Sequence, residues 1–154
     1  MLSRVPNRDD AADYTSRQAE SVAFRAKIGR LLTRSLLVLA GGAVGSLVRY
    51  LAALGINEHY DGRFPAATFL INISGSFLIG LLLVLLDRED LFHPNLRPLL
   101  VTGFLGGYTT FSTFEWETFA LGRSMPPLAV FYAVSSVLLG WLACWAGALI
   151  ARKV

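Results

Sequence analysis

Four long apolar stretches constrain the fold of this chain more than any other feature. They run from about Leu31 to Leu54, Phe64 to Leu86, Leu99 to Leu121 and Leu128 to Ile150. A helix needs about 20 apolar residues to cross the hydrocarbon core of a bilayer. The sequence therefore predicts an all-α integral membrane protein, multi-pass in the cell membrane, whose four transmembrane helices form one domain over residues 31–154.

The composition fits a chain embedded in a lipid bilayer. Hydrophobic residues make up 54% of the sequence and charged residues only 16%, too few to cover a soluble domain of this size. Seven of the fourteen Lys and Arg precede Ser35. The net charge of +3 is small and concentrated in this tail, so it does not indicate a nucleic-acid partner.

Residues 1–30 form a polar tail of mixed charge without the apolar segment of a secretory signal. Two interpretations remain open for this tail. It is mostly disordered, or residues Ala19–Arg30 form a short basic amphipathic helix that lies on the membrane surface.

The third apolar stretch contains an unusual run of polar and small residues, Gly103 to Phe114. Two glycines followed by β-branched threonines make poor helix material, which predicts a break within Gly106–Thr109. Non-helical backbone at this depth must be buried in protein or face an aqueous cavity, and its freed carbonyls are natural cation ligands. The alternative is an intact helix that is kinked at the glycines.

Phe111 and Phe114, three residues apart, share a helix face, with Ser112 and Thr113 between them. Aromatic ring edges are positive. Two such edges and hydroxyl donors can replace part of the water shell of an anion. The alternative is that both rings only pack against neighbouring helices.

Other polar residues within the stretches are functional candidates because polar groups are expensive in lipid. Asn72 offers two N–H donors to an ion, or it joins helices. Arg49 attracts anions at a pore mouth, or its side chain reaches to the interface. A weakly polar stripe at four-residue steps comprises Tyr132, Ser136, Gly140 and Cys144.

An enzyme is not indicated by these residues. His59 and His93 lie in different loops without ligands at metal-binding spacing. Ser112 has no histidine within any span to serve as its base.

The run Gly103–Phe114 closely resembles the signature of the Fluc/CrcB fluoride-channel family. The segments Gly41–Tyr50, Ala67–Gly80 and Tyr132–Gly147 resemble that family in order and spacing. The resemblance covers about Leu36 to Arg152, which is everything except the tail.

This resemblance implies a four-helix subunit with a broken third helix, assembled as an antiparallel dual-topology homodimer. It also implies a fluoride-selective channel for passive export of cytoplasmic fluoride, which relieves fluoride toxicity. A structural Na⁺ at the dimer centre is implied, held by the backbone carbonyls of Gly106 and Thr109. The implied fluoride pathway comprises Arg49, Asn72, Phe111, Ser112, Thr113, Phe114, Tyr132 and Ser136.

The chain departs from the family pattern at Glu115, Cys144 and the basic tail, whereas Glu117 matches a common glutamate. Because the tail is basic, it favours one orientation over dual insertion. The alternative function is a small multidrug or cation exporter of similar four-span architecture. Such an exporter needs a carboxylate within a span, for which Glu115 and Glu117 are the only candidates.

Overall fold

The computed structural model describes residues 8–88 and 93–153, and the described part is helical and contains no strand. The chain divides into two units, residues 1–35 and residues 36–154. Residues 1–7 of the predicted tail lie outside the described residues. Residues 89–92, between the second and third predicted spans, lie outside them as well.

Helix α1 spans Arg8–His59 and includes the first predicted span. Of the two interpretations of the tail, disorder and a short helix, the structure shows helix from Arg8 onward. The physical reason is that no proline and no glycine interrupts the chain between Arg8 and Gly29, and alanine is frequent there. Contact of this helix with a membrane surface stays a prediction.

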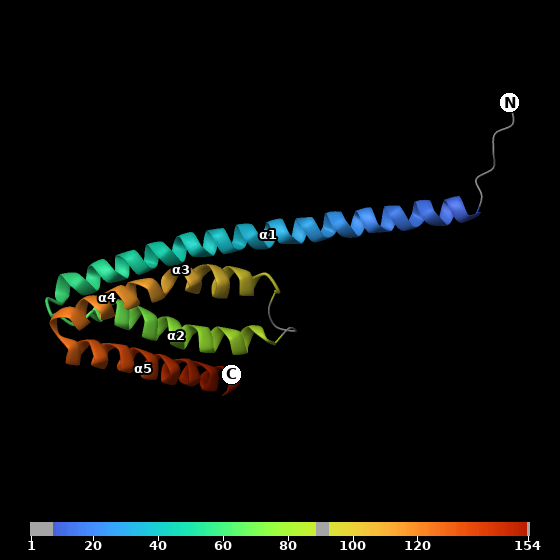
Figure 1. Ribbon diagram of the computed structural model, residues 1–154. Coiled ribbons are helices and arrows are strands. Elements are labelled where there is room, and N and C mark those ends of the chain that lie inside the picture. The colour runs from blue at the N-terminus through green and yellow to red at the C-terminus, as the bar shows by residue number, and fades with distance from the viewer. Residues whose placement is uncertain (1–7, 89–92, 154) are drawn as a thin grey trace, which may run out of the picture. The chain divides into compact units, whose positions relative to one another are not determined.

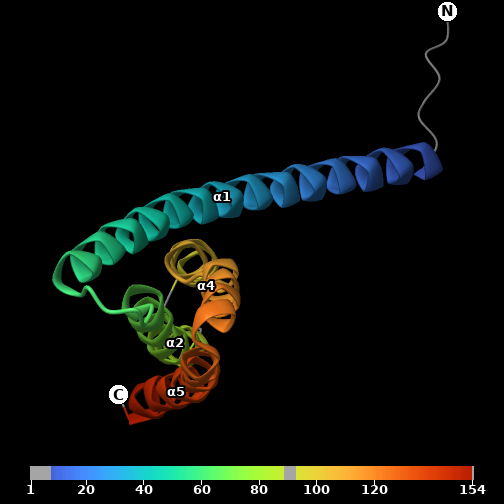
Figure 2. The ribbon, with the colours of Figure 1, turned by 60° about the vertical axis from the view of Figure 1, so that its left-hand side comes forward.

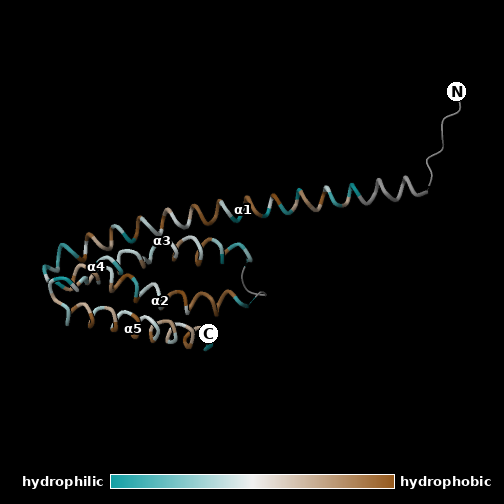
Figure 3. The backbone as a smooth tube through the Cα atoms, in the orientation of Figure 1, coloured by the Kyte–Doolittle hydropathy of each residue, from teal (hydrophilic) through white to brown (hydrophobic). Residues whose placement is uncertain are grey.

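Three helices of the described part are long and apolar enough to cross a membrane, and they correspond to the first, second and fourth predicted spans. Besides α1 they are α2, Ala66–Leu86, and α5, Pro126–Lys153. Figure 3 shows the apolar colouring of α2 along most of its length. Helix α2 ends at Leu86 as predicted. Helix α1 starts far before the predicted first span, at Arg8. The remaining helix ends differ from the predicted ones by a few residues.

The third predicted span is not one helix. It is divided into a π-helical segment η1, Arg97–Leu105, a single turn α3, Gly106–Tyr108, and helix α4, Phe111–Ser124. The predicted interruption is confirmed, although Gly106 and Gly107 are themselves helical and the extended residues are Thr109 and Thr110.

Within residues 36–154, α2 and α5 run side by side, and the η1–α3–α4 segment runs in the opposite direction (Figures 1 and 2). Glycines permit the close approach of α2 and α5. A Cβ atom on Gly80 would collide with the carbonyl of Cys144, and one on Gly147 would collide with the carbonyl of Phe77. Close backbone approach at small residues is how helices associate in lipid.

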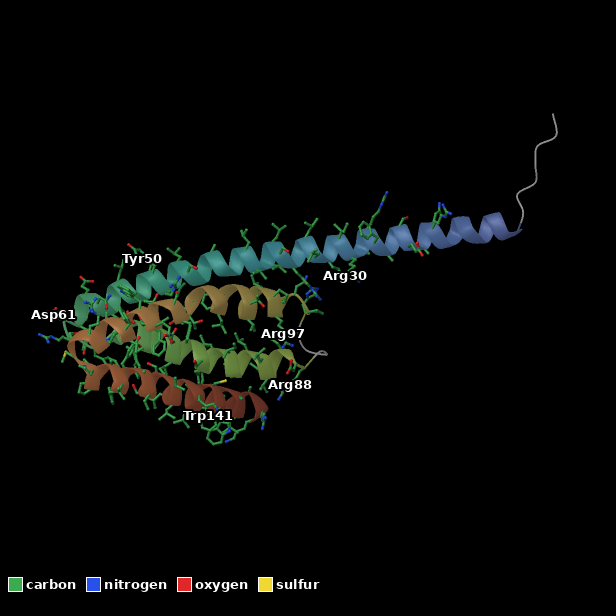
Figure 4. All side chains as sticks on the ribbon, in the orientation of Figure 1. Arg30, Tyr50, Asp61, Arg88, Arg97 and Trp141 are labelled. Carbon is green, nitrogen blue, oxygen red and sulfur yellow. The ribbon has the colours of Figure 1, made fainter. Side chains whose placement is uncertain are left out.

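The buried core is small, and many large apolar side chains are exposed. Phe114, Leu121, Ala129 and Tyr132 form a buried cluster between α4 and α5. By contrast, Trp141 is 66% exposed and projects away from the other helices (Figure 4). Apolar surface of this kind is expected where lipid takes the place of water.

Candidate functional site

The interruption lies at Thr109 and Thr110, where the backbone is extended (φ −83°, ψ 159° and φ −147°, ψ 120°). Asn72 of α2 bonds to both backbone groups of Thr110. Its Nδ2 donates to the Thr110 carbonyl at 2.9 Å, and its Oδ1 accepts the Thr110 N–H at 2.9 Å. One side-chain amide therefore satisfies polar backbone that a continuous helix would have satisfied by itself.

Helix α4 starts with a side-chain cap. The hydroxyl of Thr110 accepts the backbone N–H of Thr113 at 3.4 Å and donates to the hydroxyl of Thr113 at 3.0 Å. Threonine is a preferred residue at this position because its oxygen satisfies one of the unpaired amides of the first turn. The capping bonds fix the direction in which α4 leaves the interruption.

The interruption removes the usual helical donors from several carbonyl oxygens, and those of Gly106 and Thr109 are among them. In an α-helix the carbonyl of residue i accepts the amide of residue i+4. The amide that would serve Gly106 is that of Thr110, and it bonds to Asn72 instead. The amide that would serve Thr109 is that of Thr113, and it bonds to the Thr110 hydroxyl. These are the two carbonyls implied as Na⁺ ligands, and oxygens of this type suit a hard cation.

A cavity of about 370 Å³ lies beside the interruption. Four of the predicted site residues line it: Asn72, Gly106, Thr109 and Phe111. Ser76 and Thr102, whose side chains carry hydroxyl groups, also line it. The cavity therefore combines backbone, an amide, hydroxyls and an aromatic ring at one place.

The two phenylalanines have different surroundings. Their ring centroids are 5.9 Å apart, so they are neighbours as predicted. Phe111 is 72% exposed in the single chain, whereas Phe114 is buried. The ring of Phe114 lies 5.2 Å from that of Tyr132. Packing is thus part of the role of Phe114, and contact of either ring with an anion stays a prediction.

The carboxylate of Glu117 joins three helices. Its Oε1 accepts a hydrogen bond from the hydroxyl of Thr68 on α2 at 2.9 Å, and its Oε2 accepts one from Tyr132 on α5 at 2.8 Å. Tyr132 is completely buried. The predicted pathway residue Tyr132 therefore lies at the core of the bundle, with its hydroxyl directed at a carboxylate.

Arg49 lies on α1 and donates from Nε to the carbonyl of Gly107 at 3.0 Å. It is partly buried and lines a second cavity of about 260 Å³, together with Thr110 and Thr113. Arg49 is thus attached to the backbone just before the interruption. Both sequence-based interpretations of Arg49 stay predictions.

Ser112 and Ser136 differ in exposure. Ser112 is exposed at the start of α4. The hydroxyl oxygen of Ser136 is buried and has no hydrogen-bond partner among the described residues. An unpaired buried hydroxyl is available to a ligand, which is compatible with the implied role of Ser136.

The family described as "CrcB-like protein, Camphor Resistance (CrcB)" matches residues 36–148. The chain belongs to the CrcB family. The match begins at Leu36, which is also where the second structural unit of this CrcB chain begins.

Relatives of the CrcB chain are similar over nearly their whole length. The fluoride-specific ion channel FluC of Solibacter usitatus is 48% identical over 119 residues, covering 77% of this chain and 98% of that protein. FluC of Acidobacterium capsulatum is 46% identical over 120 residues, covering 77% and 96%. FluC 2 of Brucella abortus is 47% identical over 118 residues, covering 75% and 92%. With its apolar helices, this CrcB chain is a multi-pass membrane protein.

Sequence reasoning did not identify two contributors to the site, Thr68 and Thr110. Thr68 lies four residues before Asn72, so it shares a helix face with that candidate, and this spacing is a signal that could have found it. By helix propensity Thr110 weakens a helix, whereas in the structure its side chain caps α4. The role of Glu117 as a double acceptor has no signal in the sequence, because its donors come from other helices.

Proposed function

We propose that the chain is a fluoride-selective ion channel that lets cytoplasmic fluoride leave the cell passively and so relieves fluoride toxicity. The observation that carries this proposal is the similarity to proteins named fluoride-specific ion channel, at 43–48% identity over 95–98% of their lengths in the first three cases. The similarity spans the segment that contains the interruption, Asn72 and both phenylalanines.

The cavity beside the interruption supports the proposal chemically. Fluoride is small and tightly hydrated, so a selective path must offer hydrogen-bond donors and positive ring edges. An amide nitrogen carries two N–H groups. One N–H of Asn72 donates to Thr110, which leaves the second for an ion. Phe111 and two residues with hydroxyl groups, Ser76 and Thr102, line the same cavity.

Fluoride efflux from proteoliposomes, followed with a fluoride electrode, tests the function. We expect rapid fluoride efflux without chloride efflux, and a large loss of fluoride efflux in Phe111→Ile. Phe119→Ile is the matched control, because Phe119 is an exposed ring on the same helix and does not line the cavity. Absence of fluoride efflux from the purified wild-type protein would refute the proposal.

A structural Na⁺ bound through the carbonyls of Gly106 and Thr109 is part of the proposal. The loss of their helical donors supports it. A bound cation supplies positive charge that compensates these carbonyl dipoles. We expect the melting temperature of the purified protein to be higher in Na⁺ than in K⁺ at equal ionic strength. Equal melting temperatures would count against the cation but not against fluoride conduction.

We further infer an antiparallel dual-topology homodimer, supported by the exposure of Phe111 and Ser112 beside an open cavity. Asp61 and Arg97 lie at opposite ends of the bundle (Figure 4). In a Cys144→Ser background, Asp61→Cys and Arg97→Cys should each react partially with a membrane-impermeant thiol reagent in intact cells. Arg97→Cys removes the exposed Arg97–Asp87 ion pair, which contributes little to the free energy of unfolding. Reaction at only one of the two positions would show a single orientation.

The alternative, a small multidrug or cation exporter, rests on Glu117. Its carboxylate lies within the third predicted span and accepts only from two neutral hydroxyls among the described residues, as a proton-coupling carboxylate would require. Loss of transport in Glu117→Gln, with full transport in Phe111→Ile and Phe114→Ile, would favour the exporter. The reverse pattern favours the channel.

A further inference from the structure

The helical segment just before the family-matched region is strongly basic. It carries four cations within ten residues: Arg25, Lys27, Arg30 and Arg34. No Asp or Glu occurs between Glu20 and Glu58. All four cations are exposed, and none of them forms a salt bridge within the part of the chain that the structure describes. We call these four residues the basic collar.

The segment presents two adjacent faces of different character. Lys27, Arg30 and Arg34 follow one another at steps of three and four residues, so they share one helix face. Three apolar residues at steps of four and three share a second face, and they are 63%, 39% and 64% exposed: Phe24, Ile28 and Leu31. At 3.6 residues per turn the two faces are about 90° apart. Such a helix suits the boundary between lipid headgroups and acyl chains.

The dimensions of the basic collar match those of a membrane surface. A helix over residues 25–35 rises about 15 Å. The polar headgroup layer extends about 5–8 Å beyond the hydrocarbon on each side, and electrostatic attraction reaches about 8 Å further at physiological salt. Ser35 is joined directly to Leu36, where the apolar family-matched segment begins. Along the chain, the four cations directly precede the family-matched segment, within reach of such a surface.

We propose that the basic collar binds the anionic headgroups of phospholipids in the leaflet next to the N-terminal end of the first span. The charge complementarity carries this proposal, because the segment offers only cations to a surface that is negative. The proposal concerns residues outside the family match and does not depend on which ion the protein conducts.

The test uses the full-length chain in lipid nanodiscs. In a Cys144→Ser background, Ser21→Cys carries a fluorophore, and a lipid with a nitroxide on its headgroup quenches the fluorophore when the segment docks. We expect stronger quenching in phosphatidylcholine mixed with phosphatidylglycerol than in phosphatidylcholine alone, and weaker quenching at high salt. Each cation removed should lower the ratio of docked to undocked segment about fivefold.

Two variants with equal charge loss separate the basic collar from net charge. The collar variant changes Arg25, Lys27, Arg30 and Arg34 to Gln and should reduce quenching to the phosphatidylcholine level. The control variant changes four exposed cations elsewhere to Gln and should behave as wild type: Arg63, Arg123, Arg152 and Lys153. Equal quenching in both lipids, or insensitivity of the wild type to salt, would overturn the proposal without any variant. Equal losses in the two variants would overturn it as well.

Discussion

The amide of Asn72 and the backbone of Thr110 form two hydrogen bonds of 2.9 Å with each other, one in each direction. The pair connects α2 to the interruption of the third predicted span. Because lipid offers no water to these groups, the stability of the interruption depends on side-chain partners, of which Asn72 supplies two bonds.

Replacement of Asn72 should therefore destabilise the protein. Asn72→Leu leaves two partly buried backbone groups without partners, at a cost of about 1–3 kcal/mol each. Asn72→Gln keeps both the donor and the acceptor on a longer side chain, so its loss should be smaller. Thermal unfolding in detergent measures the stability of both Asn72 variants. Asn57→Leu, at an exposed position, is the control. Melting temperatures unchanged by Asn72→Leu would contradict the assigned role.

Because α1 packs closely against the third predicted span at Gly45, we expect alanine to be tolerated differently at two glycines of α1. A Cβ atom on Gly45 would collide with the carbonyl of Phe104, whereas one on Gly55 of the same helix would meet nothing within 4 Å. Gly45→Ala should cost about 1–3 kcal/mol through overpacking. Gly55→Ala should be neutral or slightly stabilising because alanine favours helix. Similar melting temperatures for the two variants would show that the helices do not approach at Gly45.

The shared carboxylate of Glu117 predicts coupled substitutions. Tyr132→Phe and Thr68→Val each remove one donor, at about 1.5–3 kcal/mol for a bond to a charged group. Because both donors serve the same carboxylate, their effects should not add. A double-mutant cycle on thermal or denaturant unfolding measures the coupling. Strict additivity would mean that the two hydroxyls act on Glu117 independently.

The cap of α4 predicts a difference between two conservative changes at one position. Thr110→Val removes the hydroxyl that accepts the Thr113 amide, and it should destabilise the protein by about 1 kcal/mol. Thr110→Ser keeps the hydroxyl and should restore most of that loss. Hydrogen exchange of the first-turn amides of α4 provides a local measurement. Equal exchange rates in the two variants would argue against a capping role.

The sequence was sufficient to predict the three continuous membrane helices and the interrupted segment, because these depend on long apolar runs and on local helix propensity. The predicted range of the interruption, Gly106–Thr109, includes the extended residue Thr109 but omits Thr110, and its two glycines are helical. Gly107 is helical, and it is small because a Cβ atom there would collide with the carbonyl of Gly42. Packing against a second helix, which no local pattern reveals, decided the position.

The site was predictable as a set of residue types but not as a set of partners. The polar run and Asn72 were recognisable from their cost in lipid. The different burial of Phe111 and Phe114 was not recognisable from the sequence, because their shared helix face lies at the edge of the bundle. The helical start of the tail was also missed, since a polar composition favours disorder unless the residues are strong helix formers.

The carbonyl oxygens of Gly106 and Thr109 belong to the main chain, so every amino acid at those positions supplies the same oxygen. Substitutions at Gly106 and Thr109 would therefore leave the proposed cation ligands in place, and a Cβ atom on Gly106 would meet nothing within 4 Å. The strongest signals of a mutagenesis screen for ion binding would fall on Asn72, Thr110 and Arg49, whose side chains hold that backbone in place. A genetic map of this protein would thus outline the support of the proposed cation site and leave its proposed ligands blank.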